Sequence, residues 1–99
     1  MISQFDLENA RTIVDGYGDW YGAMLLRCIA EASPMDRGLF YMIYPEETQA
    51  ILNLDLPDPG LNCTQYRVSF DQTLRDLYRK ADAENKRLLE SAFSRFTHE

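Results

Sequence analysis

Two stretches of the sequence carry the same spacing of apolar residues. In the first, one face of an amphipathic helix is formed by Tyr21, Leu25, Cys28, Ile29 and Ala32. In the second, 49 residues further along the chain, the same offsets are occupied by Phe70, Leu74, Leu77, Tyr78 and Ala81. A helical stripe that recurs in this way favours a fold in which two similar helices bury their apolar faces.

A polar cap and a second apolar helix follow each stripe. Ser33 can accept a backbone N–H of the next helix, and Pro34 stands at the first helical position, where its missing donor costs nothing. Asp82 has the same capping position in the second copy. The helix after Ser33 carries the apolar residues Leu39, Phe40, Ile43 and Tyr44. The helix after Asp82 carries Leu88, Leu89, Ala92 and Phe93. Each copy therefore predicts a helical hairpin.

The similarity of the two hairpins has two explanations, which the sequence does not separate. They are halves of an internal repeat, or they are alike because capped amphipathic helices resemble one another. Gly38 weakens the match, since glycine in a helix interior costs about 1 kcal/mol relative to alanine. Both explanations predict a common core between the two hairpins.

Further helices are predicted outside the two copies. Asp6 is placed to cap a first helix over residues 6–15, and Asp19 to cap the helix that carries the first stripe. Pro45 is placed to start a short helix between the copies, with glutamates in its first turn.

The sequence before the second stripe predicts a different element. Residues 65–70 (QYRVSF) alternate apolar and polar side chains, which is typical of a short extended segment. The chain as a whole is predicted to be all-α, a small bundle of about four to five helices. A length of 99 residues suits one domain, so a single helical domain over residues 1–99 is predicted.

Negative charge is concentrated in the first two-thirds of the chain. Residues 1–62 carry a formal charge of −7, whereas residues 63–99 carry +1. An acidic body repels nucleic-acid phosphates and is attracted to basic surfaces. Direct nucleic-acid binding by this part is therefore disfavoured, and a protein partner with a basic surface is favoured. The alternative is that the acids only keep the protein in solution.

Membrane and extracellular roles are disfavoured. No apolar run approaches the roughly 20 residues that cross a bilayer, and the first ten residues lack the basic and apolar regions of a secretion signal. Cys28 and Cys63 have no CxxC spacing, so they are predicted to be small buried apolar groups rather than a redox pair. A cytoplasmic protein outside the membrane is predicted.

Residues suited to catalysis are scarce. His98 is the only histidine and the penultimate residue, where chains usually fray, which disfavours Ser-His-Asp, Cys-His and zinc chemistry. Two carboxylate pairs could bind magnesium or exchange protons: Asp15 with Asp19, and Asp55 with Asp58. Both lie in turns rich in glycine or proline, where aspartate commonly makes local hydrogen bonds. No catalytic residue, metal or cofactor is predicted.

Aromatic residues cluster near these acids. A helix over residues 34–44 cannot bury all of its aromatic and aliphatic side chains on one narrow stripe, so some face outward or toward a partner. A wide stripe in a crowded core is the alternative. Aromatic residues with a polar tip are enriched where proteins meet. The predicted partner-binding residues are Asp15, Tyr17, Asp19, Trp20, Asp36, Phe40, Tyr41, Tyr44, Glu46 and Glu47.

A local pattern adds a resemblance. The stretch LLRCIAEASPMDRGLFYMIYPEETQAI, within residues 19–51, has a helix end, a polar cap, a leucine and an aromatic-Pro-Glu ending. The residues that carry this pattern are Ala32, Pro34, Leu39, Tyr44, Pro45 and Glu46. The pattern resembles small uncharacterised helical proteins encoded by bacteriophages and other mobile elements. The second copy, around residues 70–93, keeps Ala81, Asp82, Glu84, Asn85, Leu88 and Phe93 but has Ser94 in place of proline. The resemblance implies a mobile-element origin and a role in manipulating host machinery.

Three functional hypotheses follow. The leading one is a non-enzymatic acidic protein that binds another protein, and in a mobile-element setting an anti-CRISPR-like inhibitor whose carboxylates occupy a basic nucleic-acid groove of a host defence complex. The alternative is a homo-oligomeric structural or accessory module whose exposed aromatics close a homodimer interface. The third is an RNA or DNA contact by the basic last helix, through Arg75, Arg79, Lys80, Lys86, Arg87 and Arg95. These bases alternate with acids, which is typical of a solvated face.

Overall fold

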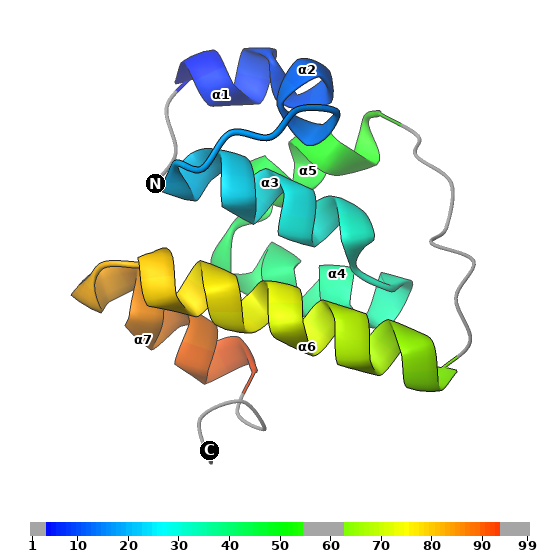
Figure 1. The fold of residues 1–99 in the computed structure, drawn as a ribbon. Coiled ribbons are helices and arrows are strands. Elements are labelled where there is room, and N and C mark those ends of the chain that lie inside the picture. The colour runs from blue at the N-terminus through cyan, green and yellow to red at the C-terminus, as the bar shows by residue number, and fades with distance from the viewer. Residues whose placement is uncertain (1–3, 55–62, 94–99) are drawn as a thin grey trace.

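Helices form every regular element in the part of the chain that the structure describes. The computed structural model describes residues 4–54 and 63–93, with the side chains of residues 63–65 left out. Its helices are α1 (Gln4–Glu8), α2 (Ala10–Val14), α3 (Tyr21–Glu31), α4 (Pro34–Ile43), α5 (Pro45–Leu52), α6 (Cys63–Lys80) and α7 (Ala83–Ala92) (Figure 1). The prediction of an all-α fold is confirmed, and the predicted count of four to five helices was too low.

Part of the difference in count comes from Asn9, which splits the helix predicted over residues 6–15. Asn9 has a non-helical backbone, with φ of −110° and ψ of 23°, and its side-chain amide donates to the Phe5 carbonyl at 2.8 Å. Asp6 does not cap this helix as predicted. It is buried inside α1, where its carboxylate accepts the Trp20 Nε1–H at 3.3 Å. A contact across 14 residues therefore replaces the predicted local cap.

Two further local predictions were wrong. The N-cap of α3 is Trp20, which makes no capping hydrogen bond through its side chain, and Asp19 before it is exposed. Residues 65–70 are helical and belong to α6. Val68 is 69% exposed, whereas Phe70 is buried, so the apparent alternation does not mark one buried face. Helical spacing from Phe70 to Leu74 describes the buried side instead.

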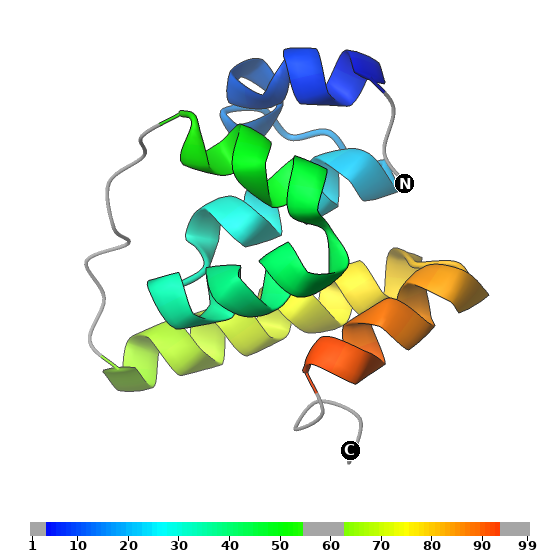
Figure 2. The ribbon, with the colours of Figure 1, turned by 180° about the vertical axis from the view of Figure 1, so that it is seen from behind.

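The two predicted hairpins are the centre of the fold. α3 packs along α6, and α4 packs against both α5 and α7. Figure 1 shows α3 and α6 running in opposite directions on the near side, and Figure 2 shows α4 and α5 nearest the viewer from behind. α1 and α2 cover the remaining sides of α3 and α5. The buried apolar side chains lie between these layers and form one core cluster.

The hairpins repeat the same local structure at the predicted offset of 49 residues. Ser33 and Asp82 are extended N-caps, and each side chain accepts the backbone N–H three residues on, at 3.3 and 2.8 Å respectively. Tyr44 and Phe93 are the corresponding C-caps, with similar backbone angles. Both hairpins therefore begin and end their second helix at equivalent residues. Whether they share an origin stays a prediction.

Equivalent positions also fill the core. Five pairs of residues at this offset are buried on both sides: Leu25 and Leu74, Cys28 and Leu77, Ala32 and Ala81, Phe40 and Leu89, and Tyr44 and Phe93. The apolar stripes of the two copies therefore face one another, as the sequence predicted.

Each hairpin turn is also joined to the other hairpin by a tyrosine. The Tyr66 hydroxyl donates to Asp36 Oδ2 at 2.6 Å and accepts the Ser33 N–H at 2.7 Å. The Tyr44 hydroxyl donates to Asn85 Oδ1 at 2.6 Å. Asp36 and Asn85 stand at equivalent positions, three residues after the two caps. These bonds fix the relative placement of the hairpins through polar contacts as well as through the core.

Removal of a cap is expected to destabilise the fold. Asp82→Ala deletes the oxygen that accepts the Asn85 N–H, so the free energy of unfolding should fall by about 1 kcal/mol. Urea unfolding followed by circular dichroism measures the change. Ser69→Ala is the control, because Ser69 is exposed in the interior of α6 and alanine favours a helix. Equal stability of Asp82→Ala and the unmodified protein would contradict the capping role.

Candidate protein-binding surface

The structure divides the ten predicted partner-binding residues into two groups. The exposed ones are Asp15, Tyr17, Asp19, Trp20, Tyr41 and Glu46. The buried ones are Asp36, Phe40, Tyr44 and Glu47. Buried side chains are not available to a partner at the surface, so the prediction was wrong for the second group.

Phe40 is buried because it forms the aromatic centre of the core. Its ring centroid lies 6.3 Å from that of Phe70, edge to face, and 4.9 Å from that of Phe93. Tyr41 and Met42, the next two residues of α4, are 47% and 77% exposed. The prediction that α4 cannot bury all of its large apolar residues is therefore confirmed. The alternative of a stripe wide enough to bury them all was wrong.

Asp36 and Tyr44 are buried because their polar groups are bound inside the molecule. Asp36 accepts the Tyr66 hydroxyl described above, beside the Ser33 cap. The Tyr44 hydroxyl lies 2.8 Å from that of Tyr21 and donates to Asn85. Burial raises the pKa of Tyr44 to about 12, so it remains a neutral donor at neutral pH. Both residues therefore hold the hairpins together.

The exposed predicted residues do not form one surface. Asp15, Tyr17 and Asp19 lie in the loop before α3, on the near side of Figure 1, whereas α4 and α5 are nearest the viewer from behind in Figure 2. Trp20 is held by its bond to Asp6, and its ring lies so close to Gly18 that a Cβ there would be 2.3 Å from a ring carbon. The predicted surface over residues 15–47 is therefore two separate regions.

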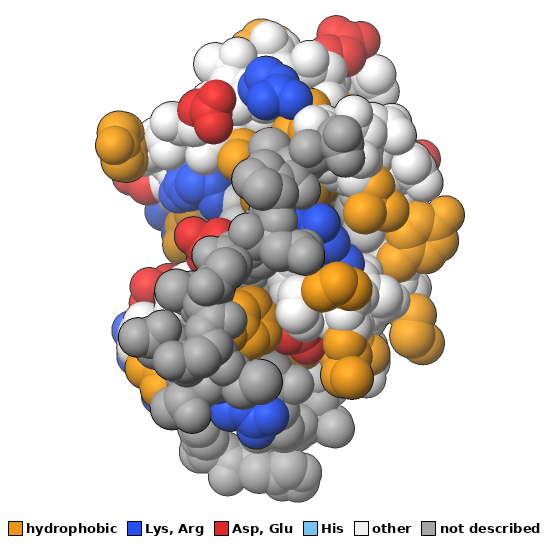
Figure 3. Space-filling view, turned by 90° about the vertical axis from the view of Figure 1, so that its right-hand side faces the viewer, with side chains coloured by type: hydrophobic (Ala, Val, Ile, Leu, Met, Phe, Trp, Pro, Cys, Tyr) orange, Lys and Arg blue, Asp and Glu red, His pale blue; other side chains and the backbone are white. Residues whose placement is uncertain are grey.

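One of these regions is an exposed apolar strip on α4. Met35 and Met42 lie seven residues apart on the same side of the helix and are 80% and 77% exposed. Gly38 lies between them, and a Cβ added to it would meet nothing within 4 Å. Hydrophobic side chains gather along the right-hand side of Figure 3, the side that carries α4. We call Met35, Gly38, Tyr41 and Met42 the α4 outer face.

A shallow hollow adjoins this face at Tyr41. It has a volume of about 420 Å³ and is walled by α1, α4 and α5 through Leu7, Tyr41, Pro45, Glu46 and Ala50, among others. Apolar carbon and one exposed carboxylate therefore lie side by side here. Such a mixture suits a partner segment with an apolar residue next to a basic one.

An acidic pocket lies on the other side of Pro45 and Glu46, which also line it. Its volume is about 230 Å³, and α4, α5 and α7 contribute its walls. Three carboxylates border it, from Glu46, Glu47 and Glu84. Glu47 is only 2% exposed, and burial raises the pKa of its carboxyl above the ordinary value. The sequence predicts Glu46 and Glu47 both at a helix start and among the partner-binding residues, but it does not predict this pocket, because Glu84 comes from the other hairpin.

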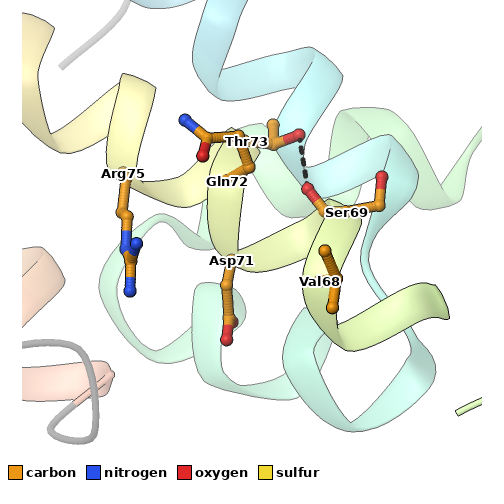
Figure 4. Close-up of a pocket in the computed structure, with 6 residues that line it drawn as sticks. All are labelled: Val68, Ser69, Asp71, Gln72, Thr73 and Arg75. Atoms are coloured by element: carbon orange, nitrogen blue, oxygen red, sulfur yellow. Dashed lines mark hydrogen bonds between the residues drawn. The ribbon is translucent and has the colours of Figure 1, made fainter. Parts of the chain in front are cut away.

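A third hollow lies along α6 and has a different character. It has a volume of about 530 Å³ and is lined by Val68, Ser69, Asp71, Gln72, Thr73 and Arg75 (Figure 4). All six residues belong to one helix, and Asp71 extends to a different side of it from Thr73. The Thr73 hydroxyl lies 3.0 Å from the Ser69 carbonyl and 3.2 Å from Glu31 Oε2 of α3, so it already has partners within the molecule.

The other candidate chemical groups are also placed by the structure. Cys28 is a buried free thiol whose pKa is raised by burial, as predicted for a small apolar group. The described part of the structure does not include His98, Asp55, Asp58 or the side chain of Cys63. Within residues 4–54 and 63–93, no group of three or more His, Cys, Asp or Glu side chains could hold a metal ion.

Several bases of the last two helices have neighbours in their own hairpin. Arg79 lies 3.6 Å from Asp76, and the Lys86 ammonium lies 5.4 Å from the centre of the Tyr78 ring. The first is a local ion pair and the second a cation–π contact, and both are common on a solvated helix face. Nucleic-acid binding by these helices stays a prediction, and Arg95 lies outside the described residues.

None of the helices in the described part of the chain is long and apolar enough to span a membrane. Comparison with family models, curated proteins and solved structures finds no match for this chain. Function is therefore inferred from its own residues.

Proposed function

We propose that this chain is a non-enzymatic protein that binds another protein through the α4 outer face and the hollow beside it. The observation that carries the proposal is Gly38, an exposed glycine in the interior of α4 between two exposed methionines. Glycine there costs about 1 kcal/mol of helix stability relative to alanine, and no neighbouring group among the described residues requires it. A partner that approaches the helix backbone closely would require it.

Exposed methionines support the same proposal. Met35 and Met42 each expose more than three-quarters of their surface, and flexible methionines are common at surfaces that bind proteins. Exposed apolar groups that gather on one face are typical of interaction sites, whereas single exposed apolar residues need no explanation. Val68, exposed on α6, is an example of the second kind among the described residues.

The proposed partner is basic. The protein has a formal charge of −6, and the exposed Glu46 lines the hollow that adjoins the α4 outer face at Tyr41. Opposite charge accelerates association and fixes orientation. The narrower proposal, an inhibitor that occupies a basic nucleic-acid groove of a host defence complex, depends on the resemblance to mobile-element proteins.

The proposal is tested with two substitutions on α4. Met42→Lys places a charge on the outer face, and Gly38→Ala adds only a methyl group. Affinity capture from a lysate of the source cells, followed by mass spectrometry, should recover a basic protein with the unmodified chain and lose it with both variants. Val68→Lys is the matched control, because Val68 is similarly exposed on another helix. Capture that persists with both α4 variants would contradict the proposal.

Gly38→Ala also separates stability from binding. Because the added methyl group has open space, the free energy of unfolding should rise by about 0.5–1 kcal/mol while partner binding weakens. Urea unfolding gives the first quantity and the capture experiment gives the second. A variant that is more stable and binds equally well would show that Gly38 has no role in docking.

A further inference from the structure

Gly38 forms the floor of a notch in the surface of α4. On a helix, the side chains three and four positions away are the neighbours that surround each residue. For Gly38 all four of these neighbours are exposed and rich in carbon: Pro34, Met35, Tyr41 and Met42. A Cβ added to Gly38 would meet nothing within 4 Å, so none of the four side chains folds over it. We call this open depression the Gly38 notch.

The Gly38 notch has the form of a site for one side chain of a second helix. Where two helices pack closely, a side chain of one enters a hole bounded by four residues of the other. A glycine at the floor of the hole makes it deeper and lets the two helix axes approach more closely. α4 is helical over its whole length, so its interior backbone is already bonded and offers no edge to an extended segment. The element that fits the notch is therefore a helix.

Charge beside the notch favours a basic helix. Tyr41 borders both the notch and the hollow of about 420 Å³, and Glu46 lines that hollow. Of the three carboxylates on α4 and α5, Asp36 and Glu47 are buried and Glu46 is exposed. The chain as a whole has a formal charge of −6. A helix with lysine or arginine beside its apolar residue is complementary to this arrangement.

We propose that the Gly38 notch receives one bulky aliphatic side chain, such as leucine, from an α-helix of the partner, with basic residues of that helix directed toward Glu46. The inference rests on the proposed function, because it specifies what the partner presents to the α4 outer face. A leucine in the notch is removed from water by the four surrounding side chains, whereas an alanine at the same point leaves the notch partly empty. The partner should therefore prefer leucine to alanine there by about tenfold in affinity.

The test uses two helical peptides of lysine and alanine, each of about 18 residues. One has a single leucine at its centre, and the other has alanine there. Binding to the full chain is followed by NMR through the methyl groups of Met35 and Met42, with the half-buried Met24 of α3 as the internal reference. The leucine peptide should shift the resonances of Met35 and Met42 and not that of Met24. It should bind about tenfold more tightly than the alanine peptide.

Gly38→Leu is the deciding variant, because its side chain fills the notch. The added group has open space and leucine favours a helix, so the variant should fold. Its affinities for the two peptides should be about equal. Ser69→Leu adds the same side chain at an exposed position of α6 and should keep the tenfold preference, within about a factor of two. Glu46→Gln should weaken both peptides by a similar factor, about twofold to fivefold, and leave the preference unchanged.

Four results would overturn the inference. The first is no difference between the two peptides, whether both bind or neither binds at about 5 mM. The second is a leucine preference that persists in Gly38→Leu. The third is equal binding of a leucine peptide with prolines in its interior, which does not stay helical. The fourth is a shift of the Met35 and Met42 resonances when the chain alone is diluted, which would assign the notch to a second copy.

This test fails separately from the capture experiment. Capture that is lost in Gly38→Ala and Met42→Lys, in a chain without a leucine preference, would contradict only the helix and its leucine. A leucine preference that Gly38→Leu abolishes, in a chain whose capture persists with both α4 variants, would contradict only the proposed function.

Discussion

Phe40→Ala is expected to reduce the free energy of unfolding by about 3–5 kcal/mol. Phe40 is fully buried and contacts Phe70 and Phe93, which belong to the other hairpin. The substitution therefore leaves a cavity at the place where the two hairpins meet. A domain of this size is stable by roughly 5–15 kcal/mol, so the variant should be close to unfolding at room temperature.

Urea unfolding followed by circular dichroism measures this loss. Tyr17→Ala is the control, because Tyr17 is 99% exposed and its removal should change stability by no more than about 0.5 kcal/mol. A loss for Phe40→Ala below about 1 kcal/mol would show that the aromatic contacts do not hold the hairpins together.

Tyr66→Phe is expected to cost about 1.5–3 kcal/mol. The hydroxyl that it removes donates to the buried carboxylate of Asp36 and accepts the Ser33 N–H, and both lose a partner in the variant. Hydrogen bonds to charged groups are stronger than neutral ones, and loss of one partner leaves the other desolvated. The effect should therefore exceed that of removing the Asp82 cap.

The same residue gives a signature at alkaline pH. Burial, followed by the hydrogen bond to Asp36, raises the pKa of Tyr66 from 10.0 to about 12 in the folded protein. Its contribution to stability is fully present below pH 10 and is lost as pH rises to about 12, because the unfolded chain loses the proton first.

Urea unfolding over this pH range should show a shallower alkaline loss of stability for Tyr66→Phe than for the unmodified protein. Tyr41→Phe, on the exposed side of α4, is the control and should follow the unmodified protein. Identical pH profiles for Tyr66→Phe and the unmodified protein would contradict the role of the hydroxyl.

The sequence predicted the hairpins well because their signals are local. A serine or aspartate before a helix, proline at its first position and apolar residues at helical spacing act over a few residues. Ser33, Pro34, Pro45 and Asp82 therefore have their predicted positions in the structure. The matching offset then identified which stripes face one another.

The errors concern contacts between distant residues. Asp6 stands where the local sequence favours a helix cap, but its carboxylate instead accepts a hydrogen bond from Trp20, 14 residues further along the chain. Successive residues of a helix point in directions about 100° apart, so Phe40 and Tyr41 of α4 cannot both face the core. Phe40 is buried and Tyr41 is exposed, because α6 and α7 pack on the side of α4 that carries Phe40. Glu84 lines the same pocket as Glu47 because α7 packs against α4. The spacing of residues along the sequence therefore could not predict the acidic pocket.

Charge alone also proved a poor guide to the site. Residues 1–62 carry most of the negative charge of the chain, yet Asp6, Asp36 and Glu47 are buried. Two of these carboxylates accept hydrogen bonds from aromatic side chains inside the molecule, the Trp20 indole and the Tyr66 hydroxyl. The proposed site therefore depends on an exposed apolar helix face with acids beside it, rather than on a large acidic area.

The most direct test of the proposed docking role is the mass of the protein in solution, because the α4 outer face could instead bind a second copy. Light scattering coupled to size-exclusion chromatography, over about two orders of magnitude in concentration, should give the monomer mass of 11.5 kDa throughout. A mass that doubles as concentration rises, and returns to the monomer value in Met42→Lys but not in Val68→Lys, would contradict docking on a different protein and assign the face to a homodimer.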